Sequence, residues 1–300
     1  MLKNTHQLKK YTFKYLIIGS NGLLGSTIQK ILPKNETFLI ARNNSDYNLD
    51  FKKLNRVEKI FEKFSFRYVI NCVAITNLNK CEKNKKNAWL INTLLPEKLS
   101  KLSQKKNFKY IHISTDHMFS SKKIKYFKEN TKYKNINYYS KTKIMAEKKI
   151  KNNKKNLIIR TNFTGFKMKN PKSTFIGWIM FNIKKKNKIS LFNDMYTSTL
   201  DVKTFSKVLI KLIKTDARGI YNVASNGCLN KKDFALKFSK LINKKLIFVE
   251  KSLRENKQKR GFCMCLNVRK VEKKLGFKMI SINKAINNLS KEKIYEYTRD

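Results

Sequence analysis

Proline and glycine are scarce in this chain, with three prolines and nine glycines among 300 residues. No stretch rich in proline, glycine and serine interrupts it, so no flexible linker marks a domain boundary. The absence of internal repeats excludes a repeat architecture. A chain of this length buries roughly three quarters of the surface it exposes when unfolded. It therefore suits one large α/β domain or a domain with a smaller lobe.

Long apolar runs are also missing. A membrane helix needs about 18 consecutive apolar residues, and the longest candidate, 175–183, is interrupted by Asn182. Residues 1–14 lack the apolar region of a signal peptide. We therefore expect a cytoplasmic protein with no membrane partner.

Cysteine is too sparse and too irregular for a disulfide framework or a zinc ribbon. The five cysteines are odd in number and include no C-x-x-C pair: Cys72, Cys81, Cys228, Cys263 and Cys265. Cys263 and Cys265 alternate with apolar residues, which indicates one face of a strand rather than a pair of metal ligands. We expect no bound metal.

Acidic residues are few, 20 against 68 Lys and Arg, which gives a formal net charge of +48. A nucleic-acid surface would concentrate basic residues on one face and use Arg for paired contacts to phosphate and guanine. Here only nine of the basic residues are Arg, and the Lys are spread from Lys3 to Lys293. AT-rich codons encode Lys, so compositional drift of the genome explains the excess without a ligand. We expect no specific nucleic-acid partner, although the charge favours salt-sensitive binding of polyanions.

What the sequence does contain is a regular alternation of short apolar runs and helical patterns. Five runs read as strands buried on both faces: 15–19, 37–41, 68–73, 110–114 and 157–160. Segments with helical spacing separate them: 23–32, 51–64, 88–104 and 139–151. This alternation predicts βαβ units and an α/β fold with a doubly wound parallel sheet, a Rossmann fold.

The second half is less regular. Helical patterns at 175–186, 204–214 and 231–242 surround one further strand pattern at 219–224. We expect a Rossmann domain over 12–165. A smaller C-terminal substrate lobe over 166–300 would be interleaved with the last strands of the sheet, near 190–225.

Three of the nine glycines fall within seven residues. Gly19, Gly22 and Gly25 form G-x-x-G-x-x-G directly after the first predicted strand and at the start of a helix. Glycine lets the backbone turn tightly and approach a pyrophosphate, whose charge then meets the free N–H groups of the helix start. The pattern predicts a dinucleotide-binding loop, with a plain tight turn as the alternative.

The end of the second predicted strand bears on cofactor choice. NAD-binding folds place Asp or Glu there to bind the ribose 2′-hydroxyl, but this chain has Arg42, followed by Asn43 and Asn44. These donors suit a 2′-phosphate and favour NADPH, with NADH also considered; a solvated strand-end charge is the alternative. Asp50, before the next helix, is interpreted as an N-cap or as a residue near the adenine.

Tyr139 and Lys143 are four residues apart in a helical pattern, so they project from the same face. An ammonium group beside a phenol lowers its pKa from about 10 and makes the tyrosine a competent acid or base. Thr115 follows the strand pattern 110–114 and so lies at the carboxyl edge of the sheet, where open α/β folds bind ligands. We expect Thr115 to donate a hydrogen bond to a substrate carbonyl while Tyr139 supplies a proton.

With these residues, the chain resembles the extended short-chain dehydrogenase/reductase family. G-x-x-G-x-x-G, the hydroxyl residue after a strand and Y-x-x-x-K occur in the family's order and spacing. Within the family it is most similar to the dTDP-4-dehydrorhamnose reductase group, over nearly the whole chain. The matching segments are 71–76 (NCVAIT), 91–92 (IN), 114–119 (STDHMF), Tyr126 with Glu129, 160–163 (RTNF) and 191–196 (LFNDMY).

The resemblance implies NADPH-dependent reduction of the 4-keto group of a nucleotide-linked 6-deoxy sugar, as in dTDP-rhamnose or related surface-polysaccharide synthesis. Thr115, Tyr139 and Lys143 would be catalytic. Lys143 would also hold the nicotinamide ribose. The cofactor site would comprise Gly19, Ser20, Asn21, Gly22, Leu23, Leu24, Gly25, Arg42, Asp50, Ala74, Thr76, Tyr139 and Lys143. The substrate would contact Asp116, His117, Phe163 and Arg260; the implied partner is this nucleotide sugar, and a homodimer is compatible with the resemblance.

The sequence departs from the group's pattern in the substrate half. His117 replaces an aromatic residue, Phe163 stands where many members have Trp, and Thr199 and Leu200 replace Pro-Thr. Arg260 is followed by glycine rather than proline. Another keto sugar or an amino sugar therefore fits nearly as well, and His117 is either a substrate contact or a packed residue.

Three other functions fit parts of the pattern. An epimerase or dehydratase of the same family would share the glycine loop and Y-x-x-x-K but retain its NAD. A noncatalytic regulatory or binding member would not need a tyrosine with a tuned pKa. A polyanion-binding protein on an inactive Rossmann fold is opposed by the scattered Lys.

Overall fold

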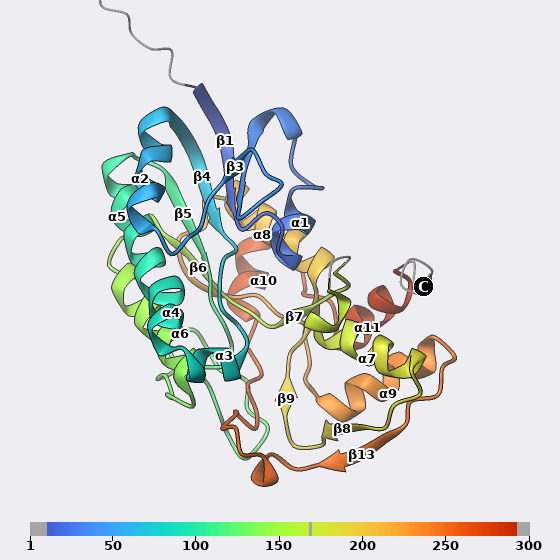
Figure 1. Cartoon of the computed structure of the whole chain (residues 1–300). Helices are drawn as coiled ribbons and strands as arrows, with labels where there is room; N and C mark the ends of the chain where they lie inside the picture. Colours follow the sequence, from blue (N-terminus) through green and yellow to red (C-terminus); the bar gives the residue numbers. More distant parts are fainter. Residues whose placement is uncertain (1–10, 168–169, 293–300) are drawn as a thin grey trace, which may run out of the picture.

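A parallel sheet of seven strands forms the centre of the molecule (Figure 1). The computed structural model describes residues 11–167 and 170–292. The strand order is β11-β6-β5-β4-β1-β2-β3, and every neighbouring pair is parallel. The strands are β1 (Tyr11–Ile18), β2 (Thr37–Ala41), β3 (Tyr47–Asn48), β4 (Phe64–Asn71), β5 (Lys109–Ile113), β6 (Leu157–Arg160) and β11 (Gly219–Asn222). The predicted α/β fold with a doubly wound parallel sheet is confirmed.

Alternate residues of the central strands enter two separate cores. Ile17 and Ile70 pack into the core on one face, whereas their neighbours Leu16 and Val69 pack into the other. Helices α1 (Leu23–Ile28), α8 (Val202–Lys214) and α10 (Arg269–Leu275) cover the first face, while α2 (Leu54–Lys63) and α5 (Leu95–Lys105) cover the second (Figure 1). Burial on both faces explains why the strands are apolar throughout rather than alternating with polar residues.

Helix α6 (Tyr138–Ile150) lies beside α5 and carries two of the predicted catalytic residues. Before it, the helical pattern at 88–104 is three consecutive pieces: α4 (Lys85–Trp89), a π-helical turn η2 (Leu90–Leu94) and α5. Helix α3 (Leu78–Lys83) precedes them. The π-helical turn was not predicted, and such turns often occur at functional sites.

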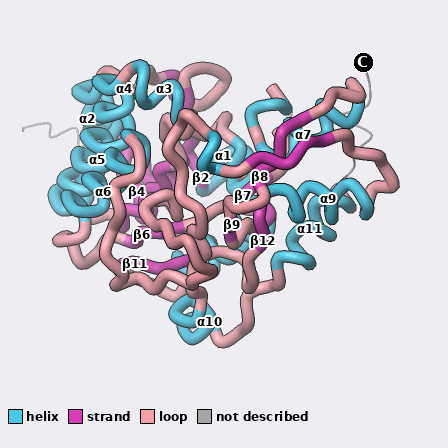
Figure 2. The backbone as a smooth tube through the Cα atoms, turned by 90° about the horizontal axis from the view of Figure 1, so that it is seen from below, coloured by secondary structure: helices cyan, strands magenta, loops and turns pink. Residues whose placement is uncertain are grey.

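A smaller group of elements packs to one side of the sheet (Figure 2). It comprises α7 (Phe175–Lys184), α9 (Lys231–Leu241), α11 (Ile282–Ser290) and the paired strands β8 (Ile189–Phe192) and β13 (Phe248–Lys251). Phe234, Phe238 and Ile286 lie in its core. Short strand pairs, β7 (Phe163–Thr164) with β10 (Leu200–Asp201) and β9 (Tyr196–Thr197) with β12 (Leu229–Asn230), accompany it. The division at residue 165 stays a prediction.

The interpretation of Cys263 and Cys265 as one face of a strand is wrong, and the described residues contain one cysteine pair. The segment around Cys263 is no regular strand, because Cys263 forms only isolated bridges with Ser121 and Tyr196. Cys265 is bonded to Cys228, with their Cα atoms 6.0 Å apart. An odd number of cysteines does not prevent a single pair from meeting, since distant loops bring them together here.

In the parts of the chain that the structure describes, every helix is too short or too polar to span a lipid bilayer.

Candidate active site

The loops after β4, β5 and β6 meet at the carboxyl edge of the sheet and enclose a cavity of about 470 Å³. Thr115 enters it from the loop after β5, and Tyr139 and Lys143 enter it from α6. The structure therefore brings together the three residues predicted to be catalytic.

The start of α6 fixes the position of the tyrosine. Asn137 caps the helix by accepting a hydrogen bond from the Ser140 amide at 2.9 Å, and Ser140 Oγ accepts one from the Asn137 amide at 3.0 Å. This reciprocal capping box satisfies two amide groups that the first turn would leave free. Tyr139 and Lys143 follow on the buried side of the helix.

Burial raises the pKa of Tyr139 above its ordinary value, and a hydrogen bond with Thr115 opposes that rise. The carboxylate of Asp116 raises the pKa further. The prediction that Lys143 lowers it is wrong for this arrangement, because the lysine is engaged elsewhere. Tyr139 is thus a protonated acid at neutral pH.

Lys143 Nζ lies 3.1 Å from Nε2 of His112 and donates a 2.7 Å hydrogen bond to the Ile113 carbonyl. Burial lowers its pKa to about 8, and the carboxylate of Glu147 opposes that effect. Lys143 is therefore close to changing its charge near neutral pH.

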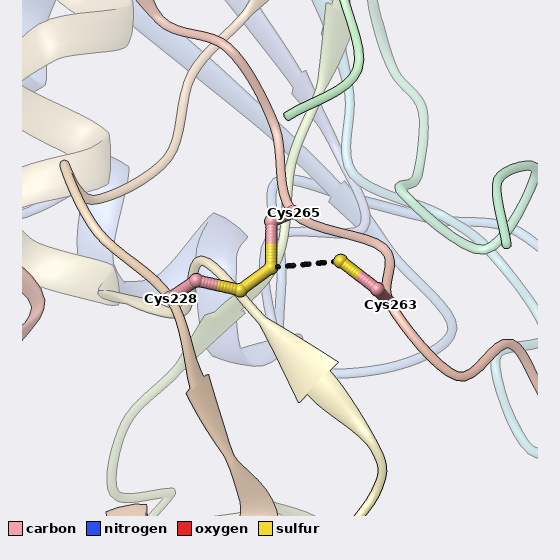
Figure 3. A group of neighbouring side chains, drawn as sticks. All are labelled: Cys228, Cys263 and Cys265. Carbon is pink, nitrogen blue, oxygen red and sulfur yellow. Dashed lines mark hydrogen bonds between the residues drawn. A yellow bond between two sulfur atoms is a disulfide. The ribbon is translucent and has the colours of Figure 1, made fainter. Parts of the chain in front are cut away.

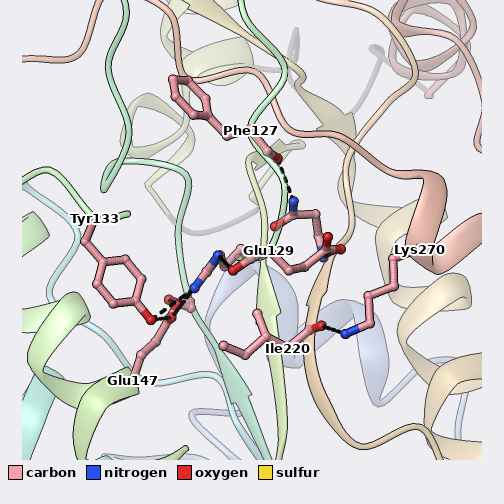
Figure 4. A network of polar contacts seen from close by, with 9 residues as sticks. Phe127, Glu129, Tyr133, Glu147, Ile220 and Lys270 are labelled. Atoms are coloured by element: carbon pink, nitrogen blue, oxygen red, sulfur yellow. Dashed lines mark hydrogen bonds and ion pairs between the residues drawn. The ribbon is translucent and has the colours of Figure 1, made fainter. Parts of the chain in front are cut away.

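Glu147 and Arg160 form a buried ion pair. Figure 4 labels Glu147 and Tyr133 of the surrounding network. Arg160 Nη2 lies 2.8 Å from Glu147 Oε2, and Tyr133 donates to the same oxygen at 3.0 Å. Ser114 donates to Oε1 at 2.6 Å. Because Ser114 directly precedes Thr115, this network holds the end of β5 against α6.

The glycine loop has the predicted turn. Gly19 has a φ of +86°, and its amide donates to the Ile40 carbonyl at 2.7 Å. A Cβ on Gly19 would lie 2.7 Å from Val73 Cγ2, and one on Gly25 would collide with the Gly19 carbonyl oxygen. Within the loop, Gly22, Leu23 and Leu24 line the cavity. Gly25 thus allows close helix packing, and its place in cofactor binding stays a prediction.

The residues predicted around the adenosine end lie outside this cavity. Arg42 is exposed directly after β2, and Asn21 Nδ2 donates to the Asn43 carbonyl at 2.5 Å. Ser20 is buried, and its Oγ has no hydrogen-bond partner. The interpretation of Asp50 as a helix N-cap is wrong, because Lys53 occupies that position in α2 and Asp50 instead accepts a hydrogen bond from the Lys52 amide.

Ala74 and Thr76 do line the cavity, on a loop that Asn92 holds. Asn92, in the π-helical turn, accepts from the Ile75 amide at 2.8 Å and donates to the Ile75 carbonyl at 2.9 Å. The motif 91–92 marked this asparagine by resemblance, but its bracing role follows only from the structure.

A second cavity of about 450 Å³ adjoins the first. Both are lined by Thr76, His117, Asn162, Phe175 and Lys231. Arg260 and Trp178 line the second alone. The Nε of Arg260 is buried without a hydrogen-bond partner, so this cavity contains an unpaired donor.

The four predicted substrate residues surround the two cavities. Asp116, His117 and Phe163 line the first, although the Phe163 ring also stacks on Phe205 with centroids 4.9 Å apart. His117 packs edge-on against Tyr139, at 5.6 Å between centroids. Burial, with the charges of Arg260 and Lys231, lowers the His117 pKa to about 3, so the ring is neutral.

The model of the RmlD substrate binding domain matches residues 13–294. The chain belongs to this family. It is 24% identical to a dTDP-4-dehydrorhamnose reductase of Salmonella typhimurium, over 73% of this chain and 75% of the relative. It is also 24% identical to a probable low-salt glycan biosynthesis reductase, Agl14, of Haloferax volcanii, over 87% and 91%.

A solved dTDP-4-dehydrorhamnose reductase of Bacillus anthracis, in complex with NADP, shares the fold. Its TM-score is 0.83 at 24% identity, and the match covers 93% of this chain and 98% of that one. The resemblance inferred from the sequence motifs is therefore confirmed.

In this member of the RmlD substrate binding domain family, Lys231 is a site residue that the sequence did not indicate. Its Nζ donates to Thr197 Oγ1 at 3.0 Å and lies 4.8 Å from the centre of the Phe175 ring. Burial lowers its pKa to about 8, and the carboxylate of Asp116 opposes that effect. One lysine among 59 carries no signal of this kind in the sequence.

Lys231 and Asp116 influence each other across the junction of the two cavities. Burial raises the pKa of Asp116 to about 7, while Lys231 and a 2.8 Å hydrogen bond from Asn162 oppose the rise. Thr199 donates to the other end of the Asn162 amide at 2.9 Å. The junction is thus a buried polar network in which Asp116 and Lys231 partly offset each other's charge.

The sulfur atoms of Cys228, Cys263 and Cys265 lie within 4.8 Å of one another (Figure 3). Cys263 Sγ is 3.4 Å from Cys265 Sγ, which is bonded to Cys228. Cys228 is three residues before Lys231 and Cys265 is five after Arg260. The bond therefore joins the two segments that bring these cations to the cavity.

Proposed function

We propose that this chain is an NADPH-dependent oxidoreductase that reduces the keto group of a nucleotide-linked sugar. The finer form of the proposal is reduction of the 4-keto group of a 6-deoxy sugar, as the names of the relatives suggest. The observation that carries it is one cavity lined both by the glycine loop and by Thr115, Tyr139 and Lys143.

The residues present fit a dinucleotide. Gly19 turns with a positive φ, and a Cβ on Gly19 or Gly25 would collide with neighbouring protein atoms, so this tight turn before the helix requires glycine at both positions. Gly22, Leu23, Leu24, Ala74 and Thr76 would hold the cofactor along the cavity. Arg42 would bind a 2′-phosphate. When bound, NADPH supplies a hydride.

The protein's own residues then handle the proton. Tyr139 donates its phenolic proton to the developing oxygen anion, and Thr115 Oγ1 places the carbonyl by hydrogen bonding. Lys143, which lines the same cavity, would hold the nicotinamide ribose, as the resemblance implies. The burial of Tyr139 supports an acid that stays protonated until the substrate takes the proton.

The second cavity supports a nucleotide diphosphate as the rest of the substrate. Arg260 and Lys231 provide two cations there, and the rings of Trp178 and Phe175 provide flat apolar surfaces. Cations pair with phosphate oxygens, and aromatic rings stack on bases. A homodimer and a location in the cytoplasm stay predictions.

The test is NADPH oxidation by the purified protein with dTDP-4-keto-6-deoxymannose, beside Tyr139→Phe and beside NADH. We expect turnover in the wild type, a loss of at least about a hundredfold in the variant, and a lower rate with NADH. NADPH binding without turnover of this sugar would contradict the finer substrate assignment. Failure to bind either cofactor would contradict the oxidoreductase itself.

A further inference from the structure

A buried row of hydrogen-bonding groups leads from Asn71, at the end of β4, to Lys143. Asn71 Nδ2 donates to the Tyr110 hydroxyl at 3.2 Å, and that hydroxyl lies 3.1 Å from Nδ1 of His112. The other ring nitrogen, Nε2, lies 3.1 Å from Lys143 Nζ. All four side chains are at most 2% exposed. No residue of this row except Lys143 has a part in the proposed reaction.

The direction of the hydrogen bond between Asn71 and Tyr110 is fixed. Asn71 Oδ1 accepts a hydrogen bond from the Val73 amide at 3.0 Å, so its NH₂ group faces Tyr110. The Tyr110 oxygen is therefore an acceptor toward Asn71, and its own hydrogen is available to His112 Nδ1.

At the lysine end, the hydrogen bond between Lys143 Nζ and His112 Nε2 can run in either direction. A charged Lys143 has only donors, so it requires a bare Nε2 and places the imidazole hydrogen on Nδ1, which then donates to the second lone pair of the Tyr110 oxygen while the Tyr110 hydrogen turns away from the ring. A neutral Lys143 has a lone pair, so it can accept from Nε2–H, and Nδ1 then accepts from Tyr110. In both cases a further Lys143 hydrogen stays on the Ile113 carbonyl, at 2.7 Å.

We propose that His112 is a positioning residue that holds Lys143 in both of its charge states by exchanging the tautomer of its ring. Lys143 and His112 together lose one proton between the two states. Lys143 goes from three hydrogens to two, and His112 keeps one hydrogen, moved from Nδ1 to Nε2. Lys143 thereby changes charge without leaving its place in the lining of the cavity.

The surroundings keep the histidine neutral throughout. Burial and the charge of Lys143 hold the pKa of His112 well below its ordinary value. Within the described residues, the ionisable groups that act on the row are Glu147, through Lys143, and Cys72, through Tyr110, and the Glu147 charge is paired with Arg160. Glu147 raises the pKa of Lys143, which is about 8, so both of its charge states occur near neutral pH.

This inference rests on the proposed function only for the part that Lys143 plays, and its test needs no substrate. The chain has three histidines, so protein labelled with ¹⁵N in histidine gives few enough signals to assign. His117→Asn identifies one of the two histidines within the described residues. Spectra recorded from about pH 6 to about pH 10 distinguish the two tautomers from the imidazolium.

We expect His112 to carry its hydrogen on Nδ1 at the acidic end and on Nε2 at the alkaline end, with a midpoint near pH 8. In Lys143→Met the change should disappear, whereas in Tyr139→Phe it should remain. One tautomer across the whole range, an imidazolium at the acidic end, or the same transition in Lys143→Met would overturn the proposal. Because these spectra need no sugar substrate, their outcome does not depend on whether the reductase assay succeeds.

Discussion

Arg160 on β6 and Glu147 on α6 pair at 2.8 Å with both side chains buried, and Glu147 also accepts a hydrogen bond from Ser114, the residue before Thr115. Neutralising the acid leaves the guanidinium buried without a counter-charge. We expect Glu147→Gln to lower the free energy of unfolding by about 3–5 kcal/mol, measured by urea denaturation. The matched surface pair Glu58–Lys98, at 3.1 Å, provides the control, and Glu58→Gln should cost at most about 1 kcal/mol. An equal decrease in the free energy of unfolding in the two variants would contradict a larger contribution of the buried pair to stability.

Lys231 is expected to bind the substrate and not the cofactor. Lys231→Met should raise KM for the nucleotide sugar about tenfold or more, the usual effect of losing a charged hydrogen bond, with NADPH affinity unchanged. The exposed Lys237 on the same helix serves as the control, and Lys237→Met should have no effect. The same substitution removes the charge that lowers the Asp116 pKa, so that pKa should rise further above about 7. A tenfold loss of NADPH affinity in Lys231→Met would contradict the assignment of Lys231 to the substrate alone.

Arg42 is expected to decide between the two nicotinamide cofactors. Arg42→Ala should raise KM for NADPH about tenfold and leave KM for NADH unchanged, because only NADPH has a 2′-phosphate. Arg56 on α2 is also exposed and is a suitable comparison, since Arg56→Ala should change neither value. An equal change for both cofactors would contradict a role for Arg42 at the 2′ position.

The reduction should slow as Lys143 loses its charge. The lysine is an ammonium below its pKa of about 8 and an amine above it, whereas Tyr139 stays protonated because burial raises its pKa. We expect kcat/KM to be level near neutral pH and to fall about tenfold per unit above about pH 8. Glu147→Gln should shift the fall to lower pH, since Glu147 raises the lysine's pKa. A profile that stays level to about pH 10 would contradict this assignment.

The sheet and the meeting of Thr115, Tyr139 and Lys143 in one cavity could be predicted because their signals are local. Alternate residues of strands such as β1 and β4 pack into two different cores. Such a strand is therefore buried on both faces, and it appears in the sequence as a continuous apolar run. Y-x-x-x-K likewise needs only one helix turn. The positions of Lys231 and of the Cys228–Cys265 bond depend on contacts between segments that are distant in the sequence. No local sequence pattern indicates such contacts.

The most direct measurement of the central claim follows the hydride itself. The protein is given dTDP-4-keto-6-deoxymannose and NADPH labelled with deuterium at the transferred position of the nicotinamide, and the sugar product is analysed by mass spectrometry and NMR. The account predicts one deuterium on the former keto carbon, with about a hundredfold slower incorporation in Tyr139→Phe. A product without deuterium, or incorporation at the same rate in the variant, would contradict it.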